Sequence, residues 1–149
     1  MIANPIFVRT ASDEDKSIIS RHQELASEES SKYRGAPYLS THQGQKIAVV
    51  AGVGATVLGS LSAVLTTSTS CQIQHVFVEK SAREVGLGDS LLRFLIDFCT
   101  KSEITWIAAS AQPGDRAMKN LFERHGLVAQ TILVGKSLNG PSTGEHASR

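Results

Sequence analysis

The sequence predicts one mixed α/β domain, and three observations indicate it. The chain has 149 residues, a length that suits one domain with a single sizeable core. Three consecutive β-rich runs between residues 46 and 80 predict an antiparallel meander. Beyond them, helical and β-rich segments alternate, which predicts at least one parallel crossover and therefore a mixed sheet. No repeat or domain boundary is visible, so we expect one domain over residues 1–138 and a flexible polar tail over residues 139–149.

The first part of the chain predicts a strand, a helix and a long loop. Residues 5–11 are β-rich, and Ser12 or Asp13 can cap a helix over residues 13–29. One face of this helix is apolar, because four residues recur at helical spacing: Ile18, Ile19, His22 and Leu25. Residues 30–45 contain helix breakers, two tyrosines and no sustained period, which predicts a loop long enough to carry function.

The rest of the chain predicts two helices and five further strands. The helices cover residues 86–101, with a broad apolar stripe, and residues 114–126, which end at Gly126. The strands cover residues 46–52, 55–67, 71–80, 104–111 and 127–135. Strict alternation in the strand at 71–80 puts Ile73, His75 and Phe77 on one side and Gln72, Gln74, Val76 and Val78 on the other.

Residues 47–65 form an uncharged stretch that is long enough to cross a bilayer. The composition favours another structure, because the stretch is rich in valine and contains three glycines. The sequence VGAT in its middle is typical of a turn between two strands. We therefore expect a buried hairpin here and not a membrane helix.

Charge and cysteine content indicate a broad class of protein. The chain has 15 Lys and Arg against 14 Asp and Glu, so neither nucleic acid nor an anionic membrane is expected as its main partner. The two widely spaced cysteines, Cys71 and Cys99, predict reduced thiols, and the N-terminal residues lack the pattern of a signal peptide. We expect a cytoplasmic protein, and no metal-ligand spacing occurs in the sequence.

Two glycine-containing segments could hold a phosphate group. Residues 52–60 have glycines at P-loop spacing but lack the lysine that this motif needs, so a hairpin turn is the better interpretation and a nucleotide site the weaker one. Residues 83–90, REVGLGDS, follow a predicted strand and begin a predicted helix. A helix N-terminus presents unpaired N–H groups, and glycines let a phosphate approach them closely. A plain strand-to-helix turn remains the alternative.

The motif Arg83-x-x-Gly86-x-Gly88 resembles the acyl-CoA pyrophosphate loop of the GNAT superfamily of N-acetyltransferases. A second block, AMKNLFERHGL at residues 117–127, is similar to the family's C-terminal LYExxGF helix. The order of predicted elements also matches across residues 5–137. The resemblance therefore rests on two motifs in the expected order.

This resemblance implies a GNAT-like fold, with a central splayed mixed sheet of six to seven strands flanked by helices, and acetyl-CoA as donor. The strands at 71–80 and 104–111 would separate into a V that holds the pantetheine arm against the backbone of Phe77 and Val78. The pyrophosphate would bind to Arg83 and to the amides of the following six residues: Glu84, Val85, Gly86, Leu87, Gly88 and Asp89. An amine would attack the thioester directly, in a ternary complex, with backbone N–H groups stabilising the oxyanion.

The positions that usually hold the family's acid and base carry other residues here. Phe122 replaces the tyrosine acid, and Asp115 replaces the asparagine that commonly precedes the last helix. Gln72, Gln74 and Ser110 occupy the positions of the usual bases. These three are our catalytic candidates, since they could order a water that relays a proton; polar lining of the cleft is the alternative. The departures also favour a rival function, a GNAT-fold module that binds acyl-CoA as a sensor.

The acceptor is expected to be a primary amine on a small molecule or peptide. The family builds this site in the loop region that here holds five candidates: Glu28, Glu29, Tyr33, Arg34 and Tyr38. A solvated acidic helix end is the alternative for the two glutamates. For His75, His125 and Cys71 we expect structural roles. GNAT domains often form homodimers, and no feature of this sequence establishes one.

Overall fold

The computed structural model describes residues 5–33 and 43–138. Two 3-10 turns, η1 (Asp13–Asp15) and η2 (Lys80–Ala82), accompany three helices and five strands in this part of the chain. The helices are α1 (Lys16–Ser30), α2 (Leu87–Lys101) and α3 (Arg116–Arg124). The strands are β1 (Ile6–Thr10), β2 (Lys46–Val53), β3 (Thr56–Thr67), β4 (Ser70–Val78) and β5 (Trp106–Ala108).

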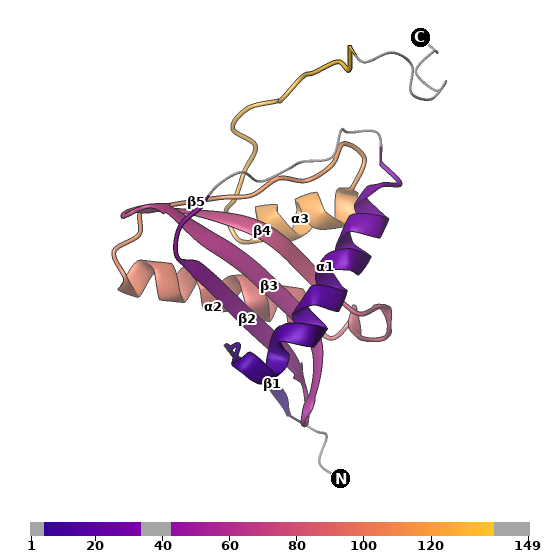
Figure 1. Ribbon diagram of the computed structural model, residues 1–149, viewed down its shortest axis with the longest axis vertical. Coiled ribbons are helices and arrows are strands. Elements are labelled where there is room, and N and C mark those ends of the chain that lie inside the picture. Colours follow the sequence, from indigo (N-terminus) through magenta and orange to yellow (C-terminus); the bar gives the residue numbers. More distant parts are fainter. Residues whose placement is uncertain (1–4, 34–42, 139–149) are drawn as a thin grey trace.

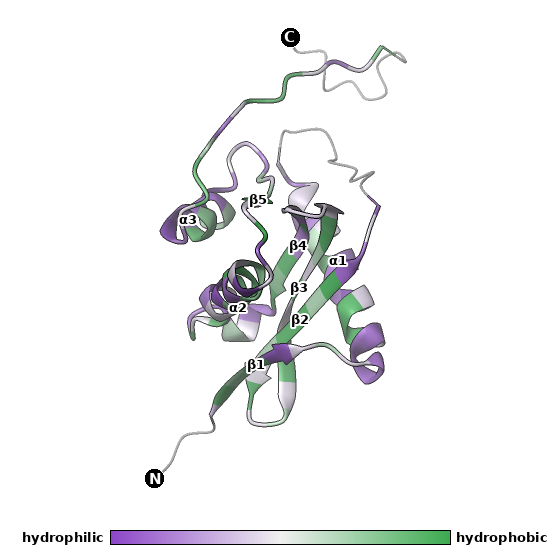
Figure 2. Cartoon of the chain, turned by 90° about the vertical axis from the view of Figure 1, so that its left-hand side faces the viewer, coloured by the Kyte–Doolittle hydropathy of each residue, from purple (hydrophilic) through white to green (hydrophobic). Residues whose placement is uncertain are grey.

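The strands form one mixed sheet in the order β1-β2-β3-β4-β5. The first four are antiparallel neighbours, and β5 lies parallel to β4 after the crossover through α2. Helix α1 lies on one face of the sheet, and α2 and α3 lie on the other (Figures 1 and 2). The predicted mixed α/β architecture, with a meander followed by a parallel crossover, is confirmed.

The uncharged stretch at 47–65 forms the β2–β3 hairpin. Gly54 and Ala55 connect the two strands, and Gly54 has a φ of 63°, a left-handed conformation that favours glycine. In the part of the chain that the structure describes, no helix has the length and apolar character to span a membrane. The hairpin interpretation of the glycines at 52–54 is therefore confirmed.

The main core lies between the sheet and α2. Four leucines of α2 are almost completely buried, in agreement with the predicted stripe: Leu87, Leu91, Leu92 and Leu95. They pack with the inner face of β2, β3 and β4 and with Phe122 of α3. Burying apolar area of this kind is the main stabilising contribution to a domain of this size.

The predicted alternation of β4 is wrong because the strand contains a bulge. Ser62 pairs with His75, but the next residue of β3, Ala63, pairs with Ile73, so β4 has one extra residue at this point. Ile73 and Val76 therefore both belong to the core under α2. His75, in contrast, bonds to Ser60, which also contacts α1. The bulge reverses the alternation and places His75 on the α1 face.

The C-terminal part of the sheet is shorter than predicted. Strand β5 covers three residues of the predicted run at 104–111, and residues 128–138 form no strand and extend away from the domain (Figure 1). A strand exists only through hydrogen bonds to a neighbour, and this segment has no neighbouring strand in the described chain. The described sheet thus has five strands instead of six to seven. The predicted tail at 139–149 lies outside the described residues.

Candidate functional site

The two parallel strands separate soon after they meet. β4 and β5 pair at Ser70–Trp106, Cys71–Ile107 and Gln72–Ala108, and β5 then ends. From Ile73 onward, the described part of the chain places no strand beside this edge of β4. The backbone N–H and C=O groups of such an edge are available to an extended ligand. This geometry corresponds to the splayed V that the resemblance implied.

The edge of β4 leads directly to the N-terminus of α2. The first hydrogen bond of this helix runs from the Ser90 N–H to the Gly86 carbonyl at 3.1 Å, so the amides of Leu87, Gly88 and Asp89 precede the helical bonding. Gly86 has a φ of 84°, and no atom beyond its own chain neighbours lies within 4 Å of the position where its Cβ would be. The loop therefore presents bare backbone at the positive end of a helix, which suits a phosphate group.

The two glycines of this loop have different surroundings. Gly86 provides the left-handed conformation and the open space. Gly88 lies inside the helix, where an added Cβ would lie 3.4 Å from Leu121 on α3. That distance is an ordinary van der Waals contact, so packing against α3 does not by itself require a glycine at this position.

Arg83 is engaged with the opposite side of the sheet. Its Nε donates to the Val78 carbonyl at 2.7 Å, and its guanidinium pairs with Glu29 of α1 at 2.8 Å. The same group lies over the Phe77 ring, 5.2 Å from the centroid. A residue predicted to bind the acetyl donor thus contacts a residue predicted to bind the amine acceptor. Glu29 is therefore not simply part of a solvated helix end.

Asp89 joins the helices on the other face. Its carboxylate accepts from Arg124 at 3.2 Å and lies 2.7 Å from Nε2 of His125. The Arg124 hydrogen bond lowers the pKa of Asp89, with a further contribution from His125. These contacts give His125 the structural role that we expected for it. Because they engage the Asp89 carboxylate, only the backbone amide of Asp89 is left for a ligand. Glu84 and Val85 are exposed in the turn before the helix.

The three catalytic candidates lie where the strands separate. The Gln72 side chain is buried, with its amide 3.5 Å from the Ile73 carbonyl, and it pairs across the sheet with Ala108. Gln74 lies within the β4 bulge. Ser110 is exposed and follows Ala108 by two residues. Phe122, at the position of the family's acid, is buried in the core, and Asp115 caps α3 by accepting from the Met118 N–H at 3.1 Å.

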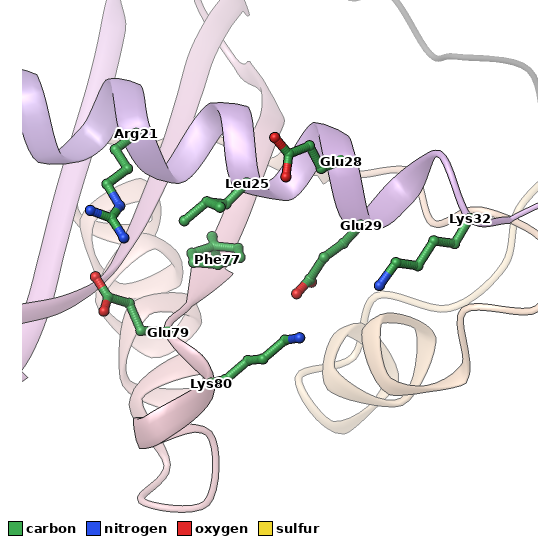
Figure 3. Close-up of a pocket in the computed structure, with 8 residues that line it drawn as sticks. All are labelled: Arg21, Leu25, Glu28, Glu29, Lys32, Phe77, Glu79 and Lys80. Atoms are coloured by element: carbon green, nitrogen blue, oxygen red, sulfur yellow. The ribbon is translucent and has the colours of Figure 1, made fainter.

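A cavity of about 350 Å³ lies between α1 and the end of β4 (Figure 3). Charged side chains of both signs line it, together with two apolar residues: Arg21, Leu25, Glu28, Glu29, Lys32, Phe77, Glu79 and Lys80. Of the five predicted acceptor residues, Glu28 and Glu29 line this cavity. Tyr33 lies further along, next to Gly114 in the loop before α3. Arg34 and Tyr38 lie outside the described residues.

The sequence interpretation missed a set of buried polar residues. His22 is fully buried on the apolar face of α1, where it contacts Ser60 at 2.8 Å and Glu79 at 3.0 Å. In the sequence, the one signal of this buried polar set was a histidine within the apolar stripe of a predicted helix. Cys71 is buried as expected, and burial, together with the neighbouring Cys99, raises its pKa to about 12.

His75 makes the stability of the fold sensitive to mild acid. Burial lowers the pKa of His75 to about 4, whereas an unfolded histidine titrates near 6.5. The unfolded chain therefore binds the extra proton first, and the free energy of unfolding falls as the pH drops from 6.5 toward 4, by up to about 3 kcal/mol. Urea unfolding at pH 7, 6 and 5 measures this slope.

The matched variant for this prediction is His75→Gln, which should show a flatter dependence over the same pH range. Asp15 and Asp89 do not interfere, because their lowered pKa values place their contribution below pH 4. Equal slopes in the two proteins would contradict the assignment of this effect to His75.

Comparison with solved structures agrees with this geometry. A protein named as a putative acetyl transferase from Pyrococcus furiosus superimposes with a TM-score of 0.69 at 19% identity, covering 90% of this chain and 100% of that one. An aminoglycoside acetyltransferase from an uncultured soil metagenomic sample superimposes with a TM-score of 0.67 at 13% identity, over 89% and 94% of the two chains. At these low identities, the superpositions show a common fold.

A third structure, AAC(6')-Iy in complex with the bisubstrate analogue CoA-S-monomethyl-acetylneamine, has a TM-score of 0.66 at 13% identity, over 89% of this chain and 99% of that chain. Among curated protein sequences there is no significant match. The sequence profile of the Acetyltransferase (GNAT) family, however, matches residues 10–127, which include the glycine loop and the last helix. This protein therefore belongs to the GNAT family of acetyltransferases.

Proposed function

We propose that this protein transfers an acetyl group from acetyl-CoA to a primary amine by direct attack in a ternary complex. One observation carries the proposal: the edge of β4 is free of β5 from Ile73 onward and leads directly to the glycine loop of α2. An extended donor with a pyrophosphate at one end matches an open strand edge followed by a helix N-terminus.

The residues of the site fit acetyl-CoA. The pantetheine arm would lie along the backbone of Phe77 and Val78, and the amides of residues 84–89 would hold the pyrophosphate. The space around Gly86 leaves room for this group. When bound, the donor supplies an activated thioester, and the protein supplies alignment of the reacting groups, which by itself can accelerate a reaction greatly.

The acceptor would enter from the α1 face, where the cavity of Figure 3 lies. Glu28 and Glu29 line this cavity and provide carboxylates for a cationic amine. One of the structures compared above is an aminoglycoside acetyltransferase, so aminoglycosides belong in any set of amines to be tested. Polyamines, lysine peptides and peptide N-termini complete that set.

The direct test is acetyl-CoA consumption with this panel of amines, alongside the affinity for CoA measured without an acceptor. We expect micromolar binding and turnover with at least one class of primary amine.

The second candidate, an acyl-CoA-binding sensor, is favoured by the buried Phe122, which cannot protonate a leaving thiolate. Micromolar binding with no turnover on any amine would support the sensor.

Replacing Glu29 with glutamine should strengthen CoA binding by about two- to fivefold. Arg83 is paired with Glu29 in this structure, and the ion pair has to weaken before the guanidinium can turn to a pyrophosphate. Both partners are partly exposed, and such pairs contribute about 0.2–1 kcal/mol. Calorimetric titration of CoA into both proteins measures the change, with Glu28→Gln as the matched control. Unchanged or weaker binding in Glu29→Gln would show that Arg83 joins α1 to the loop and does not contact the donor.

A further inference from the structure

Four polar side chains form a continuous hydrogen-bonded chain beneath α1. Glu79 Oε2 lies 3.0 Å from Nε2 of His22, and Nδ1 of His22 lies 2.8 Å from the Ser60 hydroxyl. The Ser60 hydroxyl lies 3.0 Å from Nε2 of His75. The chain therefore connects the cavity of Figure 3, which Glu79 lines, with the bulge of β4, where His75 lies.

With Glu79 ionised and both histidines neutral, the position of every proton in this chain follows. The Glu79 carboxylate can then only accept, so Nε2 of His22 carries a hydrogen and Nδ1 of His22 accepts. The Ser60 hydroxyl then donates to His22, and its oxygen accepts from Nε2–H of His75. Nδ1 of neutral His75 is left with a lone pair. This nitrogen is buried and has no hydrogen-bond partner among the described residues.

His75, which carries this lone pair, lies on β4 near the point where the edge of the strand becomes open. His75 belongs to the bulge and follows Gln72, the last residue of β4 that pairs with β5, by three positions. It also precedes Phe77, where the donor would begin to run along the strand, by two residues. A buried polar atom without a partner is rare in folded proteins and costly to retain. A ligand that donates a hydrogen bond would satisfy it.

We propose that His75 Nδ1 accepts the proton released by the attacking amine, and that Ser60, His22 and Glu79 act through it as positioning residues. This inference rests on the proposed function. The amine attacks in its neutral form, after its ammonium proton has passed to solvent: the nitrogen forms a bond to the thioester carbon, and the carbonyl electron pair moves to oxygen. The nitrogen then loses one proton to His75 Nδ1, His75 Nε2–H passes its proton to Ser60, Ser60 passes one to His22 Nδ1, and His22 Nε2–H passes one to the Glu79 carboxylate.

The cycle closes when the C–S bond breaks and CoA leaves as the thiolate. The proton held by Glu79 returns along the same path to His75 Nδ1, which gives it to the thiolate sulfur and restores the starting arrangement. Concerted transfer avoids a charged His75, which its buried position disfavours. The chain thus supplies an acid and a base where the family's usual residues are absent.

The sharpest test compares Ser60→Ala with Ser62→Ala. Both serines are buried on the same face of β3, two residues apart, and only the Ser60 hydroxyl belongs to the chain. With the best amine of the panel, Ser60→Ala should lower kcat by about 100-fold, the usual contribution of general acid–base catalysis. Ser62→Ala should stay within about twofold of the unaltered protein, and CoA affinity should be unchanged in both.

Glu79→Gln provides a second variant at a position that reaches the surface, since 28% of the Glu79 side chain is exposed. Glutamine can still accept from His22 but cannot take up its proton. We expect kcat to fall as in Ser60→Ala, with the KM for the amine nearly constant. The solvent deuterium isotope effect on kcat/KM for the amine should be clearly above unity in the unaltered protein and smaller in both variants, because several protons move together only in the intact chain.

Three results would overturn the proposal. Equal kcat values in Ser60→Ala and Ser62→Ala would show that the chain is only structural. A change confined to the KM for the amine in Glu79→Gln would assign Glu79 to acceptor binding. No turnover by the unaltered protein with any amine would overturn the proposed function, and the relay with it. Activity of the unaltered protein is enough to distinguish this outcome from the first two, because both of those require an active unaltered protein.

Discussion

Replacing Gly86 with glutamate will abolish measurable CoA binding, with an expected loss in affinity of at least about 100-fold. The new carboxylate would stand beside the amides that are proposed to hold the pyrophosphate, and it would repel the negative charge of that group. The backbone at this position has a φ of 84°, so a side chain also adds strain of about 1–2 kcal/mol. No atom beyond the chain neighbours lies within 4 Å of the new Cβ, so the substitution introduces no clash in the core.

The matched control is Gly126→Glu. Gly126 has a φ of 86°, equally open surroundings and a place just after a helix, so this variant carries the same strain and the same charge outside residues 83–89. Calorimetric titration of CoA into both variants separates the effect on the site from the effect on the backbone. Unaltered affinity in Gly86→Glu would contradict the assignment of this loop to the donor.

Replacing Leu91 with alanine will lower the free energy of unfolding by about 2–5 kcal/mol. Leu91 is completely buried in the centre of the layer between α2 and the sheet, close to Gly59 of β3. Its truncation removes apolar contacts and leaves a cavity that the surrounding strands and helix fill only in part. Since domains are typically stable by about 5–15 kcal/mol, this one change removes a large share of the total.

Leu133→Ala is the matched control, because the same atoms are removed from a side chain that is 87% exposed. We expect its effect to stay within about 0.5 kcal/mol. Urea unfolding followed by circular dichroism measures both variants. Similar losses in the two proteins would mean that residues 128–138 are buried in solution, for example against a second copy of the chain.

Much of the fold was predictable because its signals are local. The period of the leucines in α2, the β-rich runs of the meander and the glycine at the β2–β3 turn each act within one element. The strand predicted at 127–135 shows the limit of this reasoning. Its composition is suitable, but a strand also needs a neighbour, and residues 128–138 have none in the described chain.

The β4 bulge is a second example of that limit. An extra residue in one strand is defined only by its pairing with the next, so Ser62–His75 followed by Ala63–Ile73 could not be seen in the sequence. For this reason, strict alternation grouped His75 with Ile73, although the two side chains lie on opposite faces of the sheet. Likewise, the pairing of Arg83 with Glu29 joins residues 54 positions apart, and only the fold brings them together.

By itself, the sequence indicated the family and the helix N-terminus that is proposed to hold the donor. A helix N-terminus led by glycines is a property of one short segment, and the RxxGxG motif together with the last helix is enough to indicate the family. The tertiary structure decided the rest. It distinguished the surroundings of Gly86 from those of Gly88, and it joined His22 to Ser60 and Glu79 across 38 and 57 positions. Hydrogen-bonded chains of this kind depend on the packing of separate elements, and no local pattern of residues encodes that packing.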